Sequence, residues 1–279
     1  MSIRLNAIGT STWCALALTG GAYGDAVVWS ASGADAAAIS PLIDQFRAGI
    51  SAGGANNGAG GVFGTGRREI NWDAPGLDPF QSPNHMPADF FNNNSRRGAR
   101  FATPDGEGFF VSIRNGDATT RTFADIEPSY ANSFQTFSPT RLFAVDGGVV
   151  TDTTFFLPGQ NTQAATVNGF GVVFTDVDLA ASTRIELFDE ADNLLHSAFA
   201  PVSPDGGLSF LGVSFTGNER VFRARVTSGN AALGLGVVDG DGRDVVAMDD
   251  FLYSEPRAVP APGTLVLCTL GLGGLRRRR

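Results

Sequence analysis

The chain has 279 residues, of which 43% are hydrophobic and 10% aromatic, a composition typical of a globular protein with a sizeable core. All 20 basic residues are arginine, which excludes Schiff-base and lysine-nucleophile chemistry, and the segment between the two terminal stretches combines 15 arginines with all 28 acidic residues, which disfavours nucleic-acid binding. Cys14 and Cys268 lie in the terminal stretches, so the acidic body has no internal disulfide, thiol nucleophile or cysteine metal site.

Residues 1–24 have the pattern of a secretory signal peptide. Arg4 precedes a moderately apolar run over residues 8–18, and Ala22-Tyr23-Gly24 provides a small-x-small cleavage point. The alternative interpretation of this stretch is a short buried helix. We expect export, with the folded body beginning near residue 26.

One helix is predicted over residues 35–50. Apolar residues recur there at helical spacing, at Ile39, Ile43, Phe46 and Ile50, and Ser40-Pro41 suggests a cap followed by a first-turn proline. The next 16 residues contain seven glycines and are interpreted as a flexible loop, because they lack the endings of a phosphate or dinucleotide loop.

From residue 67 onward, short apolar runs alternate with Asp-Gly and Asn-Gly turns. Strands are expected at 69–72, 99–103, 108–114, 141–145, 153–157, 167–176, 184–188, 208–215, 221–227 and 245–253. This pattern predicts a mainly β fold over residues 26–255: an antiparallel, jelly-roll-like β-sandwich with one short N-terminal helix and separate hydrophobic terminal segments. Two smaller sandwiches divided near Gly148 are the alternative.

Carboxylates are the best candidates for a site in the body. Asp176 and Asp178 share a face if FTDVD is extended, and Asp249 and Asp250 follow an apolar strand, so that one of them points inward. Such oxygen ligands suit Ca²⁺, and we predict a calcium site at these four residues, with hydrogen-bonded turn caps as the alternative.

Three further acidic residues, Asp239, Asp241 and Asp244, lie in VDGDGRD. This stretch lacks the late glutamate of an EF-hand loop, and a solvated hairpin turn is the preferred interpretation.

No catalytic residues are assigned. His85 and His196 occur in unrelated contexts and are interpreted as structural or solvated, and no GxSxG motif is present. The carboxylate pairs leave a polysaccharide-cleaving enzyme as a less favoured alternative.

Sugar platforms and a basic cluster complete the candidates in the body. Possible aromatic platforms are Trp29, Trp72 and Tyr130, of which Trp72 is expected in the core. The basic cluster consists of Arg96, Arg97 and Arg100, for which pairing with acidic residues is favoured over contact with an anionic polysaccharide.

The last 21 residues, VPAPGTLVLCTLGLGGLRRRR, join a proline-rich segment to an apolar run and an arginine cluster. The run over residues 265–275 would be about 16 Å long as a helix, against roughly 30 Å of hydrocarbon, which is short for a permanent span. The positive-inside bias would hold Arg276, Arg277, Arg278 and Arg279 on the cytoplasmic side.

This tripartite end resembles the PEP-CTERM sorting signal of Gram-negative bacteria. Val259, Pro260, Ala261 and Pro262 take the place of the motif, with Ala261 where the family usually has Glu. The resemblance implies export, recognition by an exosortase-type sorting enzyme, transient anchoring in the inner membrane, and residence at the cell surface or in an exopolysaccharide matrix. If Ala261 impairs recognition, the protein would stay membrane-tethered.

The segment from residue 169 to 253 resembles a module that is frequent in PEP-CTERM and other exported bacterial proteins. Its closing MDDF is similar to the last strand of MAM-like and carbohydrate-binding jelly rolls, in which paired Asp residues can meet calcium. We therefore expect an exported, non-catalytic surface or matrix protein, with a calcium-dependent carbohydrate-binding module as the alternative.

Overall fold

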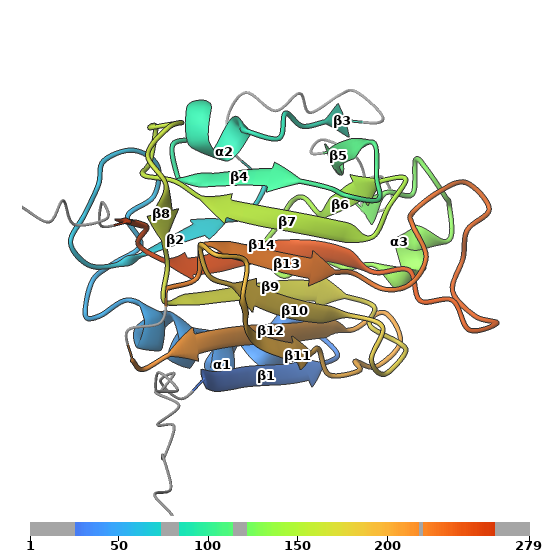
Figure 1. The fold of residues 1–279 in the computed structure, drawn as a ribbon. Coiled ribbons are helices and arrows are strands. Elements are labelled where there is room, and N and C mark those ends of the chain that lie inside the picture. Colours follow the sequence, from blue (N-terminus) through green and yellow to red (C-terminus); the bar gives the residue numbers. More distant parts are fainter. Residues whose placement is uncertain (1–25, 74–83, 114–121, 218–219, 260–279) are drawn as a thin grey trace, which may run out of the picture.

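The computed structural model describes residues 26–73, 84–113, 122–217 and 220–259, and it confirms the predicted mainly β, antiparallel sandwich (Figure 1). The predicted signal peptide (residues 1–24), residues 260–262 of the sorting motif and the four terminal arginines lie outside the described residues. Within the described ranges, no helix is long and apolar enough to cross a membrane.

Two antiparallel sheets form the sandwich, one in front of the other in Figure 1, with their strands running in roughly the same direction. The larger sheet has the order β1 (Ala26–Gly33), β12 (Leu208–Phe215), β9 (Gly169–Thr175), β14 (Ala247–Ser254), β6 (Phe143–Asp146), β5 (Gly108–Val111) and β3 (Asn84–His85), with β2 (Arg67–Ile70) paired to β14. The smaller sheet has the order β11 (Leu194–Phe199), β10 (Arg184–Phe188), β13 (Arg223–Thr227), β7 (Val150–Phe155) and β4 (Ala99–Ala102). Two short strands, β8 (Ala165–Thr166) and β15 (Arg257–Ala258), pair separately. Each of the two main sheets contains strands from both sides of Gly148.

The predicted helix is present as α1 (Ala36–Ile50), and α2 (Phe90–Asn93) and α3 (Tyr130–Ser133) are single turns. The predicted cap at Ser40 is wrong: the N-cap is Asp35, whose side chain accepts a hydrogen bond from the Ala38 N–H at 3.0 Å. Ser40 lies inside the helix, and its hydroxyl donates to the Ala36 carbonyl. The alanines before Ser40 favour helix, so α1 begins upstream of the predicted cap.

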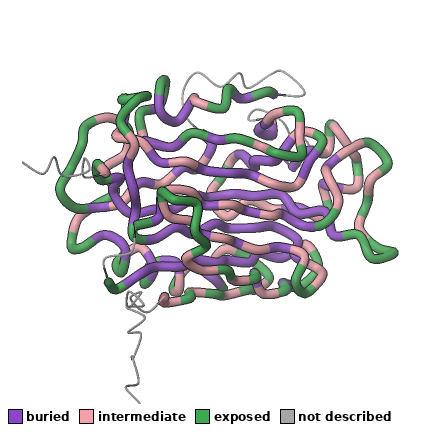
Figure 2. The backbone as a smooth tube through the Cα atoms, viewed as in Figure 1, coloured by how far each residue is buried: buried purple, intermediate pink, exposed green. Residues whose placement is uncertain are grey.

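The core has two main layers. Aromatic side chains fill the space between the sheets, where Trp72 stacks on Phe143 with 4.0 Å between ring centroids. On the other face of the larger sheet, α1 packs Ile43 and Phe46 against Phe210. The central strands are therefore buried on both faces and appear purple along their length in Figure 2.

Each of the ten predicted strands overlaps a strand of the structure. The two-residue strands β3, β8 and β15 were not predicted, nor were the longer strands β1 and β11. Both lie at sheet edges, where one side of the strand faces solvent: Val28 and Phe199 are exposed. The sequence of an edge strand needs less apolar character, so its pattern is weaker than that of the central strands.

Candidate metal centre

Three loops meet at one end of the sandwich because their strands are antiparallel neighbours. The chain leaves β9 at this end and enters β12 and β14 there, which brings together residues 176–182, 203–207 and 239–244 (the right-hand end in Figure 1). The loops carry five aspartates in two groups that share one member: Asp176, Asp178 and Asp205 form the first group, and Asp178, Asp239 and Asp244 the second. In each group, one carboxylate oxygen per residue lies within 4.8 Å of the others.

Asp176 is the buried residue of the first group. Its side chain is turned into the protein at 1% exposure, on a backbone with a φ of 66°. The Gly206 N–H donates to Oδ1 at 2.8 Å, whereas Oδ2 is buried without a hydrogen-bond donor. Burial, together with the nearby carboxylates of Asp178 and Asp239, raises the pKa of Asp176 to about 8. A cation beside Oδ2 would stabilise the ionised form of Asp176.

The carboxylates of Asp178, Asp239 and Asp244 differ in their hydrogen-bond partners. Burial and nearby carboxylates raise the pKa of Asp178 and that of Asp239, although the Val245 N–H donates to Asp239. Asp244 is fully buried and accepts from the N–H groups of Asp178 and Leu179 and from the Ser182 hydroxyl. Asp244 thus fastens the loop after β9, and the clusters could hold a metal ion that prefers oxygen ligands.

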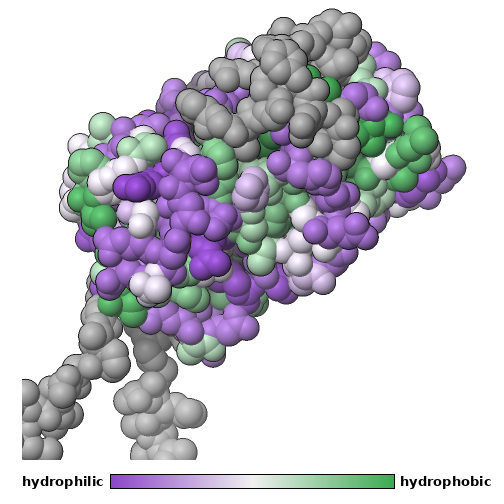
Figure 3. Space-filling view, turned by 90° about the horizontal axis from the view of Figure 1, so that it is seen from above, coloured by the Kyte–Doolittle hydropathy of each residue, from purple (hydrophilic) through white to green (hydrophobic). Residues whose placement is uncertain are grey.

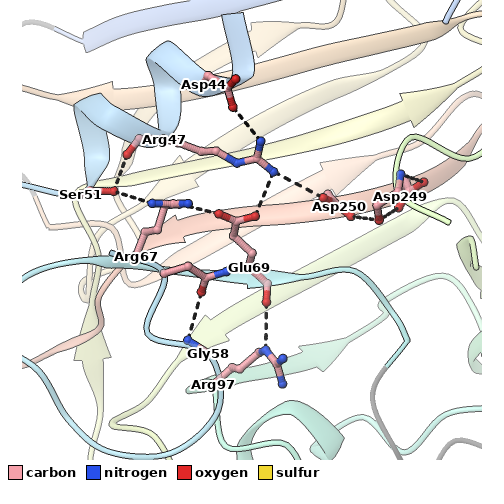
Figure 4. A network of polar contacts seen from close by, with 11 residues as sticks. Asp44, Arg47, Ser51, Gly58, Arg67, Glu69, Arg97, Asp249 and Asp250 are labelled. Atoms are coloured by element: carbon pink, nitrogen blue, oxygen red, sulfur yellow. Dashed lines mark hydrogen bonds and ion pairs between the residues drawn. The ribbon is translucent and has the colours of Figure 1, made fainter. Parts of the chain in front are cut away.

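The structure separates the two predicted aspartate pairs. Asp249 and Asp250 belong to neither group but to a buried network in β14, where the pairing with β9 is irregular between Met248 and Phe251 (Figure 4). The Phe137 N–H donates to Asp249 at 2.6 Å, and the Ser138 hydroxyl donates to Asp250 at 2.5 Å.

Burial raises the pKa of both members of this pair, that of Asp250 to about 6. An Arg47 nitrogen lies 3.8 Å from Asp250 and 2.9 Å from Glu69. Backbone donors and an arginine therefore occupy these carboxylates, and calcium binding by Asp249 and Asp250 stays a prediction.

The loops depart from the sequence expectations at three residues. Asp176 follows β9 in a left-handed conformation, so FTDVD is not extended there, yet its carboxylate still approaches that of Asp178. The solvated turn holds for Asp241, which is exposed, but not for the fully buried Asp244. Asp205 was missed, because Asp205-Gly206 has the pattern of an ordinary turn and only the pairing of β9 with β12 brings it to Asp176.

The other candidates are held by local contacts. Trp72 and Tyr130 are fully buried, so these two rings offer no sugar platform. The Trp29 indole N–H donates to the Ser214 hydroxyl at 2.9 Å. His85 is exposed, with Nδ1 3.7 Å from Asp146, and His196 is half-buried on β11.

The basic cluster faces aromatic rings rather than carboxylates. Arg97 lies over the Phe91 ring and donates to the Glu69 carbonyl, and Arg100 lies over the Phe156 ring. Within the described ranges, no ion pair involves the cluster, and its pairing with acidic residues stays a prediction. Hydrophilic side chains interrupt the apolar ones over the face seen from above in Figure 3.

No family model, curated protein or solved structure matches the chain. The function of the chain is therefore inferred from the chemistry of the loops and from the sequences of the two terminal segments.

Proposed function

We propose that this chain is an exported, non-catalytic protein of the cell surface or extracellular matrix, associated with exopolysaccharide, whose sandwich binds calcium at its loop end. The proposed calcium binding is supported by Asp176, whose buried Oδ2 has no hydrogen-bond donor and whose carboxylate belongs to a group of three. The export part is supported by the sequences of the two termini, the signal peptide pattern and the PEP-CTERM-like tail.

Calcium is the cation that fits the donor set. Asp176, Asp178 and Asp205 offer only oxygen, and Ca²⁺ takes oxygen ligands at 2.3–2.6 Å, so ligands on opposite sides of one ion lie about 5 Å apart. The three carboxylates, which lie within 4.8 Å of one another, are close enough to bind one such ion. Zinc would favour histidine or cysteine ligands, and the two groups contain neither.

The first prediction concerns thermal stability. Calcium should raise the melting temperature of the wild-type protein relative to EDTA, because a ligand that binds only the folded state stabilises it by several kcal/mol at saturation, ~3 kcal/mol at a hundredfold excess over Kd. Asp176→Asn should remove most of this rise, since it deletes one ligand charge from the group. The measurement is a calorimetric or fluorescence melt with calcium, magnesium and EDTA.

Two further variants make the test specific. Asp241→Asn changes an exposed aspartate of the same loops that belongs to neither group, and it should keep the wild-type calcium response. If the response survives in Asp176→Asn but disappears in Asp250→Asn, the ion binds at the buried pair instead. No calcium response in the wild-type protein would overturn the calcium part of the proposal.

A further inference from the structure

A hollow of about 460 Å³ lies on the outer face of the smaller sheet, beside the acidic loops. Arg184, Phe199 and Thr227 form part of its lining and come from three neighbouring strands at aligned positions, because Arg184 pairs with Phe199 on one side and with Thr227 on the other. Their neighbours Ile185 and Val226 are buried in the core, so the alternation along the strands directs Arg184 and Thr227 outward. The loop residues 179–182, Val149, Gly229 and Asn230 supply the rest of the rim.

The chemistry of the hollow is unusual for this acidic molecule. Phe199 is 50% exposed, whereas Trp72 and Tyr130, two of the aromatic platforms expected from the sequence, are fully buried. Arg184 is the single charged residue among those that line the hollow in the described chain, and no carboxylate lines it. Arg184 is 41% exposed at its side chain and contacts Glu186, outside the hollow, at 3.2 Å.

An exposed aromatic ring beside one arginine and a hydroxyl fits an acidic sugar. The apolar C–H face of a pyranose ring packs on an aromatic side chain, a guanidinium forms charge-assisted hydrogen bonds with a carboxylate, and Thr227 and Asn230 can bond sugar hydroxyls. A neutral sugar would offer no carboxylate to Arg184, and an acidic peptide would offer no sugar ring to pack on Phe199.

One wall of the hollow is connected to the acidic cluster by a continuous chain of contacts. The Asp178 N–H donates to Asp244 at 3.0 Å, and Asp244 also accepts from the Leu179 N–H and the Ser182 hydroxyl. Leu179 and Ser182 both line the hollow. A cation bound by the Asp178 carboxylate would neutralise the charges that repel one another there and hold this wall in place.

We propose that the hollow binds a uronic acid unit of an acidic polysaccharide, and that calcium at the Asp178 carboxylate strengthens this binding by fixing the wall formed by residues 179–182. This inference rests on the calcium site of the proposed function and adds its ligand. Phe199 is the stacking platform, Arg184 the carboxylate partner, and Asp178 the residue through which the metal acts.

The test is calorimetric titration of the full chain with trigalacturonate, which is too short to gel with calcium, against maltotriose and triglutamate as neutral and peptidic controls. Trigalacturonate should bind in calcium and at least severalfold more weakly in EDTA. Phe199→Ala and Arg184→Gln should each weaken binding about tenfold. Leu194→Ala, on the same strand at 54% exposure and outside the hollow, should bind like wild type.

The outcomes separate this inference from the proposed function. Both hollow variants should keep the calcium-induced rise in melting temperature, which shows that they fold. Equal affinity of Phe199→Ala and wild type, or equal binding of trigalacturonate and triglutamate, would overturn the inference while leaving the calcium site intact. Absence of the calcium rise in wild type would instead overturn the site on which the coupling depends.

Discussion

At the scale of single residues, the protein buries carboxylates in two different ways. Asp244 and Asp249 are fully buried, and each accepts hydrogen bonds from two backbone N–H groups and a serine hydroxyl. Asp176 is equally buried, but one of its oxygens has no donor. This difference, which sequence spacing does not reveal, is what distinguishes a structural aspartate from a candidate metal ligand.

A prediction at this scale concerns Asp250 and pH. Burial raises its pKa to about 6 in the folded state, above the ordinary value of 3.8, so its contribution to stability is complete below about pH 4 and is lost as pH rises through about 6. Asp250→Asn should remove this loss. We expect a net stabilisation at pH 7 of ~1–2 kcal/mol, which already allows for the lost attraction to Arg47. The measurement is urea unfolding between pH 4 and 8 in buffers that contain calcium.

Asp44→Asn is the matched control for this prediction. It changes the exposed carboxylate partner of the same arginine and should leave the pH profile between 4 and 8 close to wild type. A profile of Asp250→Asn that falls between pH 4 and 7 as steeply as wild type would contradict the assignment.

At the scale of elements, a buried ion pair organises the glycine-rich segment between α1 and β2. Arg68 and Glu255 form two hydrogen bonds of 2.6 Å, and both side chains are at most 2% exposed. Arg68 also donates to the carbonyls of Gly58, Gly60 and Gly61, and Glu255 accepts from the Phe63 N–H. The segment interpreted as a flexible loop is thus wrapped around this pair.

Removing one partner of the pair should therefore be costly. Arg68→Ala leaves Glu255 as an unpaired buried charge and frees three carbonyls, and we expect a loss of ~3–5 kcal/mol of unfolding free energy. Arg67→Ala, at the neighbouring and partly exposed pair with Glu69, should cost no more than about 1 kcal/mol. Denaturant unfolding compares the two, and similar costs for both variants would show that the buried pair does not organise the segment.

The elements also show how far the sequence predicts the structure. The central strands were predicted because both of their faces are buried, which produces apolar runs such as those of β9 and β12. The edge strands β1 and β11 were missed because they expose one side, although the edge strand β4 was predicted. Asp205 was missed because its approach to Asp176 depends on strand pairing, not on local pattern. The bounds of α1 were predicted to within one residue, whereas its cap was placed at Ser40 because capping signals compete at Asp35 and Ser40.

At the scale of the whole molecule, the hydrophobic core of the described chain is formed by residues between the two terminal segments. All members of the three hydrophobic clusters lie between residues 26 and 253. After β14 the described chain contributes Glu255 to the ion pair with Arg68, pairs β15 with β8, and donates hydrogen bonds from Arg257 to Gly64 and from Val259 to Ala164. The tail that resembles a sorting signal is therefore joined to the sandwich after the last core strand.

Deletion of residues 259–279 tests this division between folding and delivery. The truncated protein should keep its stability to within about 0.5 kcal/mol, because the deletion removes no core side chain. It should also lose surface retention, because the proposed sorting enzyme would have no segment to recognise. Thermal melts measure the first effect and fractionation of the native host measures the second, with Arg276, Arg277, Arg278 and Arg279 replaced by alanine as a control that retains the apolar run. Surface retention unchanged by the deletion would contradict the sorting role, whereas a destabilised truncation would show that the tail contributes to the fold.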